Sequence, residues 1–316
     1  MTPRMALERD RQQLAWHYTS AEALISILHT DALRATSAAF MNDANEMKTG
    51  VRALKRTYER MRESFSPAER KAIEESGALN ERSVDHLFLL SASRGPDRLT
   101  LWRNYGGATT PYAIGLDRSV LLRPLEVVEG RRHPRPPEGW DSVGWEESAD
   151  GPVRIYDPDE VWVFGGQWND VMYVNRKGTQ SHEQSLRALA KDRMDGQERG
   201  SFLVSLPDFA DSPVYLEKDA SFEDEDEVRL VVEANPSWKF LQFRGDRFGA
   251  VPYVELSSSD ERGRFISAAA DRKLPIREIW IGPSADAVTA RRALESLLHV
   301  SGYGDVHVRS TSIPYR

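Results

Sequence analysis

Short runs of apolar residues, each bounded by polar or turn-forming residues, recur along the chain and predict β-strands. One of them contains Leu87-Phe88-Leu89-Leu90 and is typical of a strand buried on both faces. The segments predicted to be strands or extended are 14–19, 33–40, 86–93, 112–116, 161–164, 170–174, 227–233, 276–282 and 306–310.

Helices are predicted where apolar residues recur at three- and four-residue spacing behind a capping residue. The clearest start is Ser66-Pro67-Ala68-Glu69, in which a capping serine precedes a proline and an acidic residue. Ser20 also precedes an apolar stripe, and Asp97 is expected to cap a short helix. The other predicted helices cover residues 20–28, 47–64, 97–105 and 286–300.

Strands and helices are interleaved without the regular order of βαβ units. This order favours an α+β fold with mainly antiparallel sheets and flanking helices. We expect a single domain over residues 1–316. Residues 131–151, rich in proline and arginine, are expected to form an irregular excursion within it.

Composition narrows the class of protein. The chain has 316 residues, a formal net charge of -7 and no cysteine, which excludes disulfides, thiolate metal sites and cysteine nucleophiles. Residues 1–11 do not resemble a signal peptide, and no apolar run approaches the roughly 20 residues that cross a bilayer. We therefore expect a cytoplasmic protein without membrane contact.

Several standard signatures are absent from the sequence: G-x-x-x-x-G-K-[ST], G-x-G-x-x-G, H-E-x-x-H and G-x-S-x-G. The seven histidines are scattered without the spacing of metal ligands. P-loop nucleoside triphosphatases, Rossmann dehydrogenases and zinc proteases of the H-E-x-x-H type are therefore not favoured, and no metal is expected.

A predicted strand around Glu225-Asp226-Glu227-Val228-Arg229 combines an apolar face with a charged face. Alternation places Val228, Leu230 and Val232 on one face, and Glu225, Glu227 and Arg229 on the other. If the charged face closes onto a cleft, the two acids raise each other's pKa and Arg229 lowers both. Such a set suits the stabilisation of a cationic transition state. The alternative is an edge strand whose charged face is solvated.

Three further groups are candidates for ligand contact. His17-Tyr18-Thr19 ends the first strand just before a helix start, a place where ligands commonly bind, although a lone histidine there is also often structural. Trp102 and Tyr105 lie three residues apart on one helical turn, as core residues or as a stacking platform. Asn42, Asp43 and Glu46 form either a turn with a helix cap or a polar clamp near a substrate.

Taken in order, these segments resemble the bacterial family known as domain of unknown function (DUF) 2971. The matching pieces are His17-Tyr18-Thr19, Met41-Asn42-Asp43-Ala44-Asn45-Glu46, Ser91-Ala92-Ser93, Leu101-Trp102-Arg103-Asn104-Tyr105-Gly106, Tyr112-Ala113-Ile114-Gly115-Leu116-Asp117, the set Lys218, Phe222, Glu225, Glu227 and Arg229, Ile281-Gly282-Pro283 and Ser312-Ile313-Pro314-Tyr315-Arg316. The resemblance covers essentially the whole chain, apart from the excursion at 131–151.

The chain also resembles the ADP-ribosyltransferase superfamily, which cleaves NAD+ at the nicotinamide–ribose bond. That superfamily has a histidine at the end of its first strand, an aromatic residue that stacks on nicotinamide, and a catalytic glutamate in an E-x-E pattern. His17, Tyr105 and Glu225-x-Glu227 occur in the same order here.

The resemblance implies NAD+ as co-substrate and assigns roles. Glu227 would accept from the ribose 2′-hydroxyl, Glu225 would position the attacking group and His17 would bond a ribose hydroxyl. Tyr105 or Trp102 would stack on nicotinamide, and Arg229 would pair with Glu225 or hold a phosphate. The residues implied around NAD+ are His17, Tyr18, Thr19, Ser91, Ser93, Trp102, Tyr105 and Arg229, with Asn42, Asp43 and Glu46 on the substrate.

Three functions remain open from the sequence. The first is NAD+-dependent ADP-ribosyl transfer or NAD+ hydrolysis, as a toxin or phage-defence effector, with an unknown protein or nucleic acid as acceptor and a restraining partner or antitoxin protein. The second is a non-catalytic module that binds a nucleotide or a protein. The third is a metal-dependent nuclease or phosphodiesterase using Asp224, Asp226 and Glu227. Strand alternation disfavours it, because Asp226 and Glu227 fall on opposite faces.

Overall fold

A computed structural model of the chain describes residues 13–40, 44–76, 78–79, 87–106, 110–125, 144–148, 151–155, 161–163, 168–174, 180–194, 216–234, 238, 240–258 and 273–314. Its strands are β1 (Leu14–Thr19), β2 (Leu33–Ser37), β3 (Leu87–Ser93), β4 (Tyr112–Asp117), β5 (Arg123–Pro124), β6 (Gly144–Ser148), β7 (Gly151–Ile155), β8 (Val161–Val163), β9 (Asn169–Asp170), β10 (Met172–Val174), β11 (Glu217–Asp219), β12 (Glu227–Ala234), β13 (Gln242–Asp246), β14 (Gly249–Ser257), β15 (Ile276–Ile281) and β16 (His307–Ser310). Its helices are α2 (Ala21–Thr30), α3 (Ala44–Met61), α4 (Pro67–Glu75), α5 (Leu99–Tyr105), α6 (Gln180–Met194) and α7 (Ala287–Val300), and short 3-10 helices cover Ala38–Phe40, Arg62–Ser64 and Ala220–Glu225.

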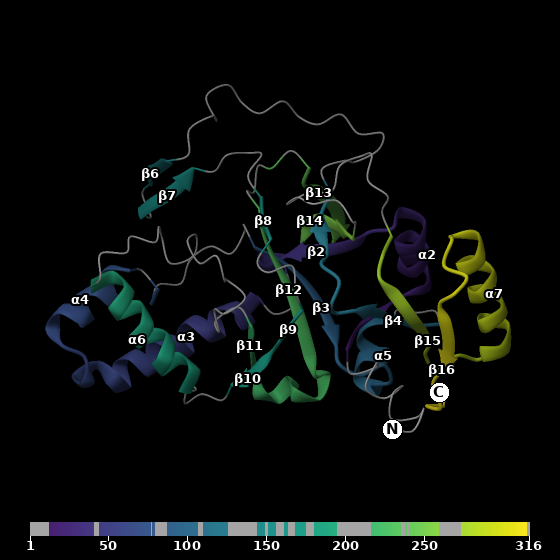
Figure 1. Cartoon of the computed structure of the whole chain (residues 1–316), viewed down its shortest axis with the longest axis horizontal. Coiled ribbons are helices and arrows are strands. Elements are labelled where there is room, and N and C mark those ends of the chain that lie inside the picture. Colours follow the sequence, from purple (N-terminus) through teal and green to yellow (C-terminus); the bar gives the residue numbers. More distant parts are fainter. Residues whose placement is uncertain are drawn as a thin grey trace.

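One large sheet organises these elements. Eight strands follow the order β13-β14-β2-β3-β1-β4-β15-β16, and β12 runs along β3 and in turn pairs with β8 and β9. Within this sheet only β15 and β16 are parallel; the other described pairs are antiparallel. Figure 1 shows helices flanking the sheet. The prediction of an α+β protein with a mainly antiparallel sheet is therefore confirmed.

The sheet divides at β3, and this division creates the space for a site. On one edge β3 pairs with β12 along its whole length, from Leu87 to Ser93. On the other edge it changes partner: Ser93 pairs with Trp16 of β1, whereas Leu89 pairs with Thr36 of β2. The part of β3 between these two pairings faces a fork where β1 and β2 diverge.

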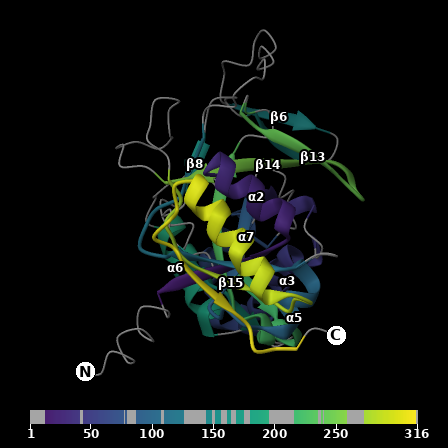
Figure 2. The ribbon, with the colours of Figure 1, turned by 90° about the vertical axis from the view of Figure 1, so that its right-hand side faces the viewer.

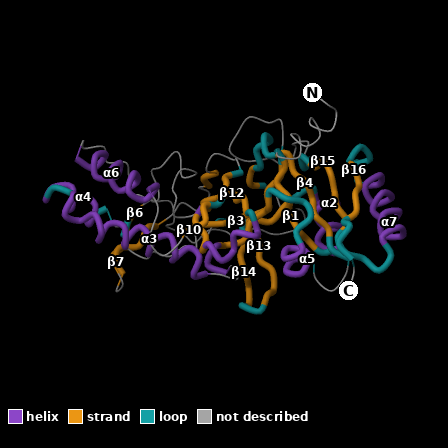
Figure 3. The backbone as a smooth tube through the Cα atoms, turned by 90° about the horizontal axis from the view of Figure 1, so that it is seen from below, coloured by secondary structure: helices purple, strands orange, loops and turns teal. Residues whose placement is uncertain are grey.

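Alternation along β3 and β12 sends their side chains into two different cores. Phe88, Leu90 and Ala92 join Val228, Leu230 and Val232 in the main core, which α2 and α7 cover. Leu87, Leu89 and Val231 point the other way and are covered by apolar residues of α3, α4 and α6. Figures 1 and 3 show these three helices grouped at the opposite end of the molecule from α2 and α7, which lie side by side in Figure 2.

Local signals explain where several helices begin. Ser66 and Glu69 form a complete capping box before α4: the Ser66 hydroxyl accepts from the Glu69 amide, and the Glu69 carboxylate accepts from the Ser66 amide. Ser20 caps α2 as predicted. The expectation for Asp97 was wrong, because Arg98 is the residue before α5 and the Asp97 carboxylate instead accepts from the Trp102 indole at 2.8 Å.

Two further expectations need correction. Within residues 131–151 the chain is not irregular throughout, since Gly144–Ser148 forms β6 and pairs with β7 as an antiparallel hairpin; residues 131–143 and 149–150 lie outside the described part. The predicted strand at 225–229 begins later, because Glu225 ends a 3-10 helix and β12 starts at Glu227. Among the described residues no helix is long and apolar enough to cross a membrane.

Candidate functional site

A pocket of about 700 Å³ lies at the fork in the sheet. Its walls come from β1, β2 and β3, from the start of β12, and from parts of α2, α5, β11 and β13. This volume is within the roughly 300–1,000 Å³ of small-molecule sites. The pocket therefore brings together residues that are far apart in the sequence, among them His17, Tyr105 and Glu227.

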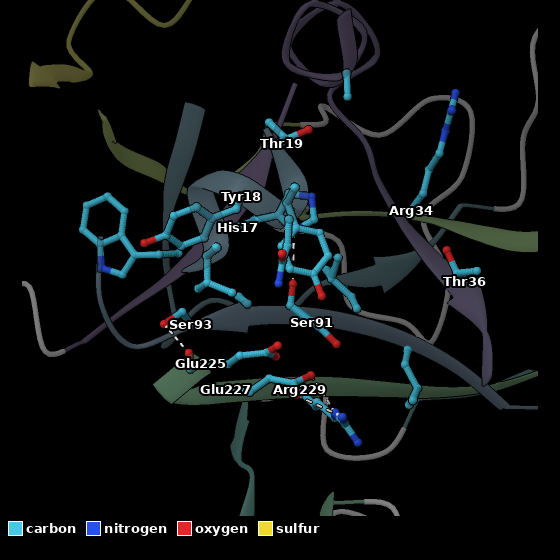
Figure 4. Close-up of a pocket in the computed structure, with 18 of the residues that line it drawn as sticks. His17, Tyr18, Thr19, Arg34, Thr36, Ser91, Ser93, Glu225, Glu227 and Arg229 are labelled. Atoms are coloured by element: carbon cyan, nitrogen blue, oxygen red, sulfur yellow. Dashed lines mark hydrogen bonds and ion pairs between the residues drawn. The ribbon is translucent and has the colours of Figure 1, made fainter. Parts of the chain in front are cut away.

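Four buried charged side chains form one side of the pocket. Glu227 receives two hydrogen bonds from Arg229, Nε to Oε1 at 2.7 Å and Nη2 to Oε2 at 2.9 Å. Lys218 Nζ bridges the two acids, at 2.7 Å from Glu225 Oε2 and 3.0 Å from Glu227 Oε2. All four residues are at most 8% exposed. The cluster is thus a compact, internally neutralised network, whose two acids and Arg229 appear in Figure 4.

The charged face of β12 is not solvated, so the alternative of an exposed edge strand is wrong. β12 has β3 on one edge and β8 and β9 on the other. The Arg229 side chain is 1% exposed and forms a fork with Glu227. Arg229 therefore pairs with Glu227, and it also lines the pocket.

Glu225 belongs to the cluster but, contrary to the prediction from the sequence, does not lie on the strand. It ends the 3-10 helix Ala220–Glu225, and Asp226 then adopts a left-handed conformation with φ 47° that turns the chain into β12. The Asp226 carboxylate is held by Arg94, with Nε at 2.6 Å, and by a second ion pair with Arg98. This turn brings Glu225 beside Glu227 although only Glu227 lies on the strand.

Electrostatics keep Glu227 ionised. Burial alone would raise its pKa, but the charge and hydrogen bonds of Arg229, together with the charge of Lys218, outweigh burial and lower the pKa from 4.5 to about 2. Glu227 is therefore a fixed negative charge at any physiological pH. It is unsuited to act as a proton-donating acid.

His17 presents a hydrogen-bond acceptor to the same pocket. Its Nδ1 lies 3.1 Å from the Ser91 carbonyl oxygen, which can only accept, so Nδ1 carries the proton. Burial lowers the pKa of His17 from 6.5, against the opposing effect of this hydrogen bond, so the ring is neutral at pH 7. A neutral ring protonated at Nδ1 leaves Nε2 as an acceptor, and the Nδ1 bond fixes its direction.

Tyr18, Ser93 and Thr19 shape the pocket wall. The Tyr18 hydroxyl donates to the Gly95 carbonyl at 2.8 Å and accepts from the Arg98 amide at 3.0 Å, which fastens the loop before α5. The Ser93 hydroxyl donates to the Glu225 carbonyl at 2.8 Å and so holds the end of the 3-10 helix. Burial raises the pKa of Tyr18, and Thr19 is buried in the pocket lining. The Tyr18 and Ser93 hydroxyls are therefore committed to contacts within the protein.

The structure separates the two aromatic candidates of α5. Trp102 is 4% exposed, packs edge-on against Tyr18 and does not line the pocket. Tyr105 is 46% exposed and does line it. Tyr105 is accordingly the aromatic residue of this helix that a ligand can reach.

The remaining predicted residues divide into two groups. Asn42 and Asp43 lie outside the described residues, and so does the side chain of Glu46 on α3. Asp224 accepts from the Thr100 hydroxyl at 2.7 Å, and Asp226 pairs with Arg94 and Arg98, so these two acids do not share partners with Glu227. That arrangement gives no support to a joint metal site of Asp224, Asp226 and Glu227.

Sequence reasoning missed three cations of the pocket: Lys218, Arg34 and Arg244. Lys218 precedes Glu225 by seven residues in the sequence, but β11 was not predicted, so the orientation of Lys218 could not be deduced. Arg34 sits on the predicted second strand, where strand alternation alone gave no reason to select it. Arg244 belongs to β13, which has no apolar alternation in its sequence.

Comparison of the chain with protein-family models, with curated proteins and with solved structures finds no match.

Proposed function

We propose that the pocket binds NAD+ and breaks its nicotinamide–ribose bond, passing ADP-ribose to a protein or nucleic-acid acceptor or to water. The chain would then be an ADP-ribosyltransferase-like member of the DUF 2971 family. The toxin or phage-defence setting, and a partner that restrains the activity, belong to the same proposal and rest on the family resemblance.

The observation that carries this proposal is the buried Glu227 carboxylate, held at the pocket by hydrogen bonds from Arg229 and Lys218 that favour its ionised form. In NAD+ the bond between ribose C1′ and the ring nitrogen breaks with its electron pair going to the positively charged ring, so nicotinamide leaves without needing a proton. The acceptor oxygen then bonds C1′, and its proton passes to water. A fixed carboxylate suits this step, because it stabilises the cation that develops on the ribose. Hydrolysis of an ordinary glycoside would require a protonated acid instead.

Other side chains of the pocket fit complementary parts of the same substrate. The Glu227 carboxylate would accept a hydrogen bond from a ribose hydroxyl, beside the three that it receives from Arg229 and Lys218 and next to the Ser91 hydroxyl. His17 Nε2 would accept from a second hydroxyl, and Tyr105 would stack on nicotinamide. Glu225, held through Oε2 by Lys218, would orient the acceptor.

A non-catalytic nucleotide-binding module is the second candidate. The observation in its favour is that Arg229 and Lys218 both form ion pairs with Glu227. A buried ion-pair network of this kind can have a purely structural role. Such a module would keep the pocket, His17 and Tyr105 but would leave bound NAD+ intact.

The test is to incubate purified protein with NAD+ and follow nicotinamide release, with mass analysis of the protein and of added nucleic acid. Glu227→Gln keeps the shape of the side chain and removes its charge. Glu278→Gln is the matched control, since Glu278 is a buried glutamate of β15 that pairs with Arg309 of β16 and does not line the pocket. Circular dichroism of each variant checks folding.

Release by wild type and Glu278→Gln, but not by folded Glu227→Gln, is the expected result. An added mass of ADP-ribose would identify the acceptor, and its absence would indicate hydrolysis. Binding of NAD+ without any release by wild type would favour the binding module. If wild type neither releases nicotinamide nor binds NAD+ in calorimetry, the proposal is wrong.

A further inference from the structure

A second polar surface faces the same pocket from the ribbon of strands β13, β14 and β2. The register pairs Arg244 with Val251, Tyr253 with Thr36 and Glu255 with Arg34. Paired residues project from the same face of a sheet, so Arg34, Thr36, Arg244 and Asp246 all lie on one face. All four line the pocket, and we call this set the polar wall. Figure 4 shows Arg34 and Thr36 set apart from the Glu225–Glu227–Arg229 cluster.

Within the described residues, the two arginines of the polar wall have weaker contacts with carboxylates than Arg229 has. Arg34 lies 3.7 Å from Glu255, longer than a hydrogen bond, and its guanidinium sits 4.8 Å from the Tyr253 ring centre. Its side chain is 42% exposed. Among the described residues no side chain forms an ion pair with Arg244. The ring and the nearby carboxylate orient Arg34 without using up its donors.

We propose that the polar wall is a phosphate-binding subsite, in which Arg34 and Arg244 together bind the diphosphate of a nucleotide whose sugar lies toward His17 and Glu227. Guanidinium groups bind phosphate oxygens through paired N–H donors, and two of them from different strands fit a diphosphate. The inference rests on the proposed function for the identity of the nucleotide, and it specifies which residues select a phosphorylated ligand.

The buried cations cannot fill this role. Lys218 and Arg229 are at most 5% exposed and hold Glu225 and Glu227, so a phosphate beside them would meet two carboxylates. Arg34 and Arg244 are the other two cations among the described lining residues. The pocket is therefore divided into a part where the carboxylates are already paired with cations, which suits sugar hydroxyls, and an arginine-bearing part that suits phosphate.

Asp246 completes the polar wall and narrows the ligand class. Its Oδ1 accepts from the Arg247 backbone amide at 2.5 Å, which directs the carboxylate. A carboxylate there accepts hydrogen bonds from a sugar hydroxyl, which a nucleotide has and inorganic phosphate lacks. Two guanidiniums beside one carboxylate and the Thr36 hydroxyl thus match a phosphorylated sugar better than a bare anion.

The experiment compares calorimetric binding of ADP and of adenosine, which differ by the diphosphate alone. The variants are Arg34→Gln and Arg244→Gln. Arg247→Gln is the matched control, because Arg247 lies in the turn of the same hairpin, stacks on Phe248 at 4.6 Å and does not line the pocket. Neither ligand contains nicotinamide, so the outcome is independent of whether NAD+ is cleaved.

We expect wild type and Arg247→Gln to bind ADP more tightly than adenosine, with affinity that falls as salt rises. Each pocket variant should weaken ADP binding by about tenfold or more and leave adenosine binding unchanged. Equal affinity for the two ligands in wild type, or equal loss in the Arg247→Gln control, would overturn the phosphate subsite. If wild type cleaves NAD+ but Arg34→Gln and Arg244→Gln bind ADP like wild type, the phosphate subsite is wrong and the proposed function still stands.

Discussion

Replacing Glu227 by glutamine should make the stability of the protein less dependent on pH in the acid range. A fall of the pKa from 4.5 to about 2 in the folded state corresponds to about 3 kcal/mol of stabilisation. The side chain is only 4% exposed, so screening by solvent removes little of this. Because the folded pKa is depressed, the stabilisation is present above about pH 4.5 and is lost as the pH falls toward 2.

Glutamine cannot ionise, so the variant lacks this contribution at every pH, and Arg229 and Lys218 lose the charge that compensates them. The variant should therefore be about 3 kcal/mol less stable than wild type at pH 7. At pH 3 this difference should be about 2 kcal/mol smaller, because the ionised Glu227 carboxylate then contributes less to the free energy of unfolding of wild type.

Urea unfolding followed by tryptophan fluorescence at pH 7, 5 and 3 measures both quantities. Glu75→Gln is the control, since Glu75 is exposed on α4 and its pair with Lys71 spans 3.8 Å. The control should differ from wild type by less than about 0.5 kcal/mol. A Glu227→Gln variant as stable as wild type at pH 7, or a gap that stays constant down to pH 3, would refute the account of the buried network.

Three further outcomes are expected. Tyr105→Ala should weaken NAD+ binding about tenfold in calorimetry while Tyr105→Phe binds like wild type, because stacking needs the ring and not the hydroxyl; equal losses would exclude stacking. The His17 ring should titrate below pH 6.5 in NMR, and its neutral form should make the fold less stable as the pH falls through 6.5, the ordinary pKa of the free ring. A titration above 6.5 would contradict the effect assigned to burial. Lys218→Met should destabilise the protein in urea unfolding by more than Lys71→Met, because it leaves Glu225 beside Glu227 without the bridging charge; similar losses would remove Lys218 from the network.

The elements predicted correctly are those whose signals are local. Ser20 and the apolar stripe behind it define α2, the Ser66 capping box defines α4, and the apolar run of β3 marks a strand buried on both faces. In each case neighbours in sequence decide the structure, so the amino-acid order is sufficient. The boundaries then follow within a few residues.

Elements that depend on distant partners could not be deduced. β13 carries Phe243 and Arg244 with no apolar alternation, and it is a strand because β14 pairs with it. Helix α6 is mostly polar, with a few buried positions such as Leu186 that reach the core of α3 and α4. For such segments the tertiary partner, and not the local pattern, determines the structure.

The candidate site shows the same limit. Residue types and order indicated His17, Tyr105 and Glu227, and the structure places all three at one pocket. The position of Glu225 depends on the left-handed turn at Asp226 and on the ion pairs of Asp226 with Arg94 and Arg98. These ion pairs join residues that are far apart in the sequence, so the spacing of Glu225 and Glu227 could not reveal them. Arg34 and Arg244 line the same pocket because β14 joins β2 to β13 in the sheet.

The most direct test of the central claim is the rate of nicotinamide release from NAD+ by wild type and by Glu227→Gln, at a pH and temperature where both are folded. The account predicts release by wild type and a loss of at least about a hundredfold in the variant, because the fixed charge that stabilises the ribose cation is gone. Equal release by the two proteins would show that Glu227 is structural, and no release or NAD+ binding by wild type would contradict the proposed function itself.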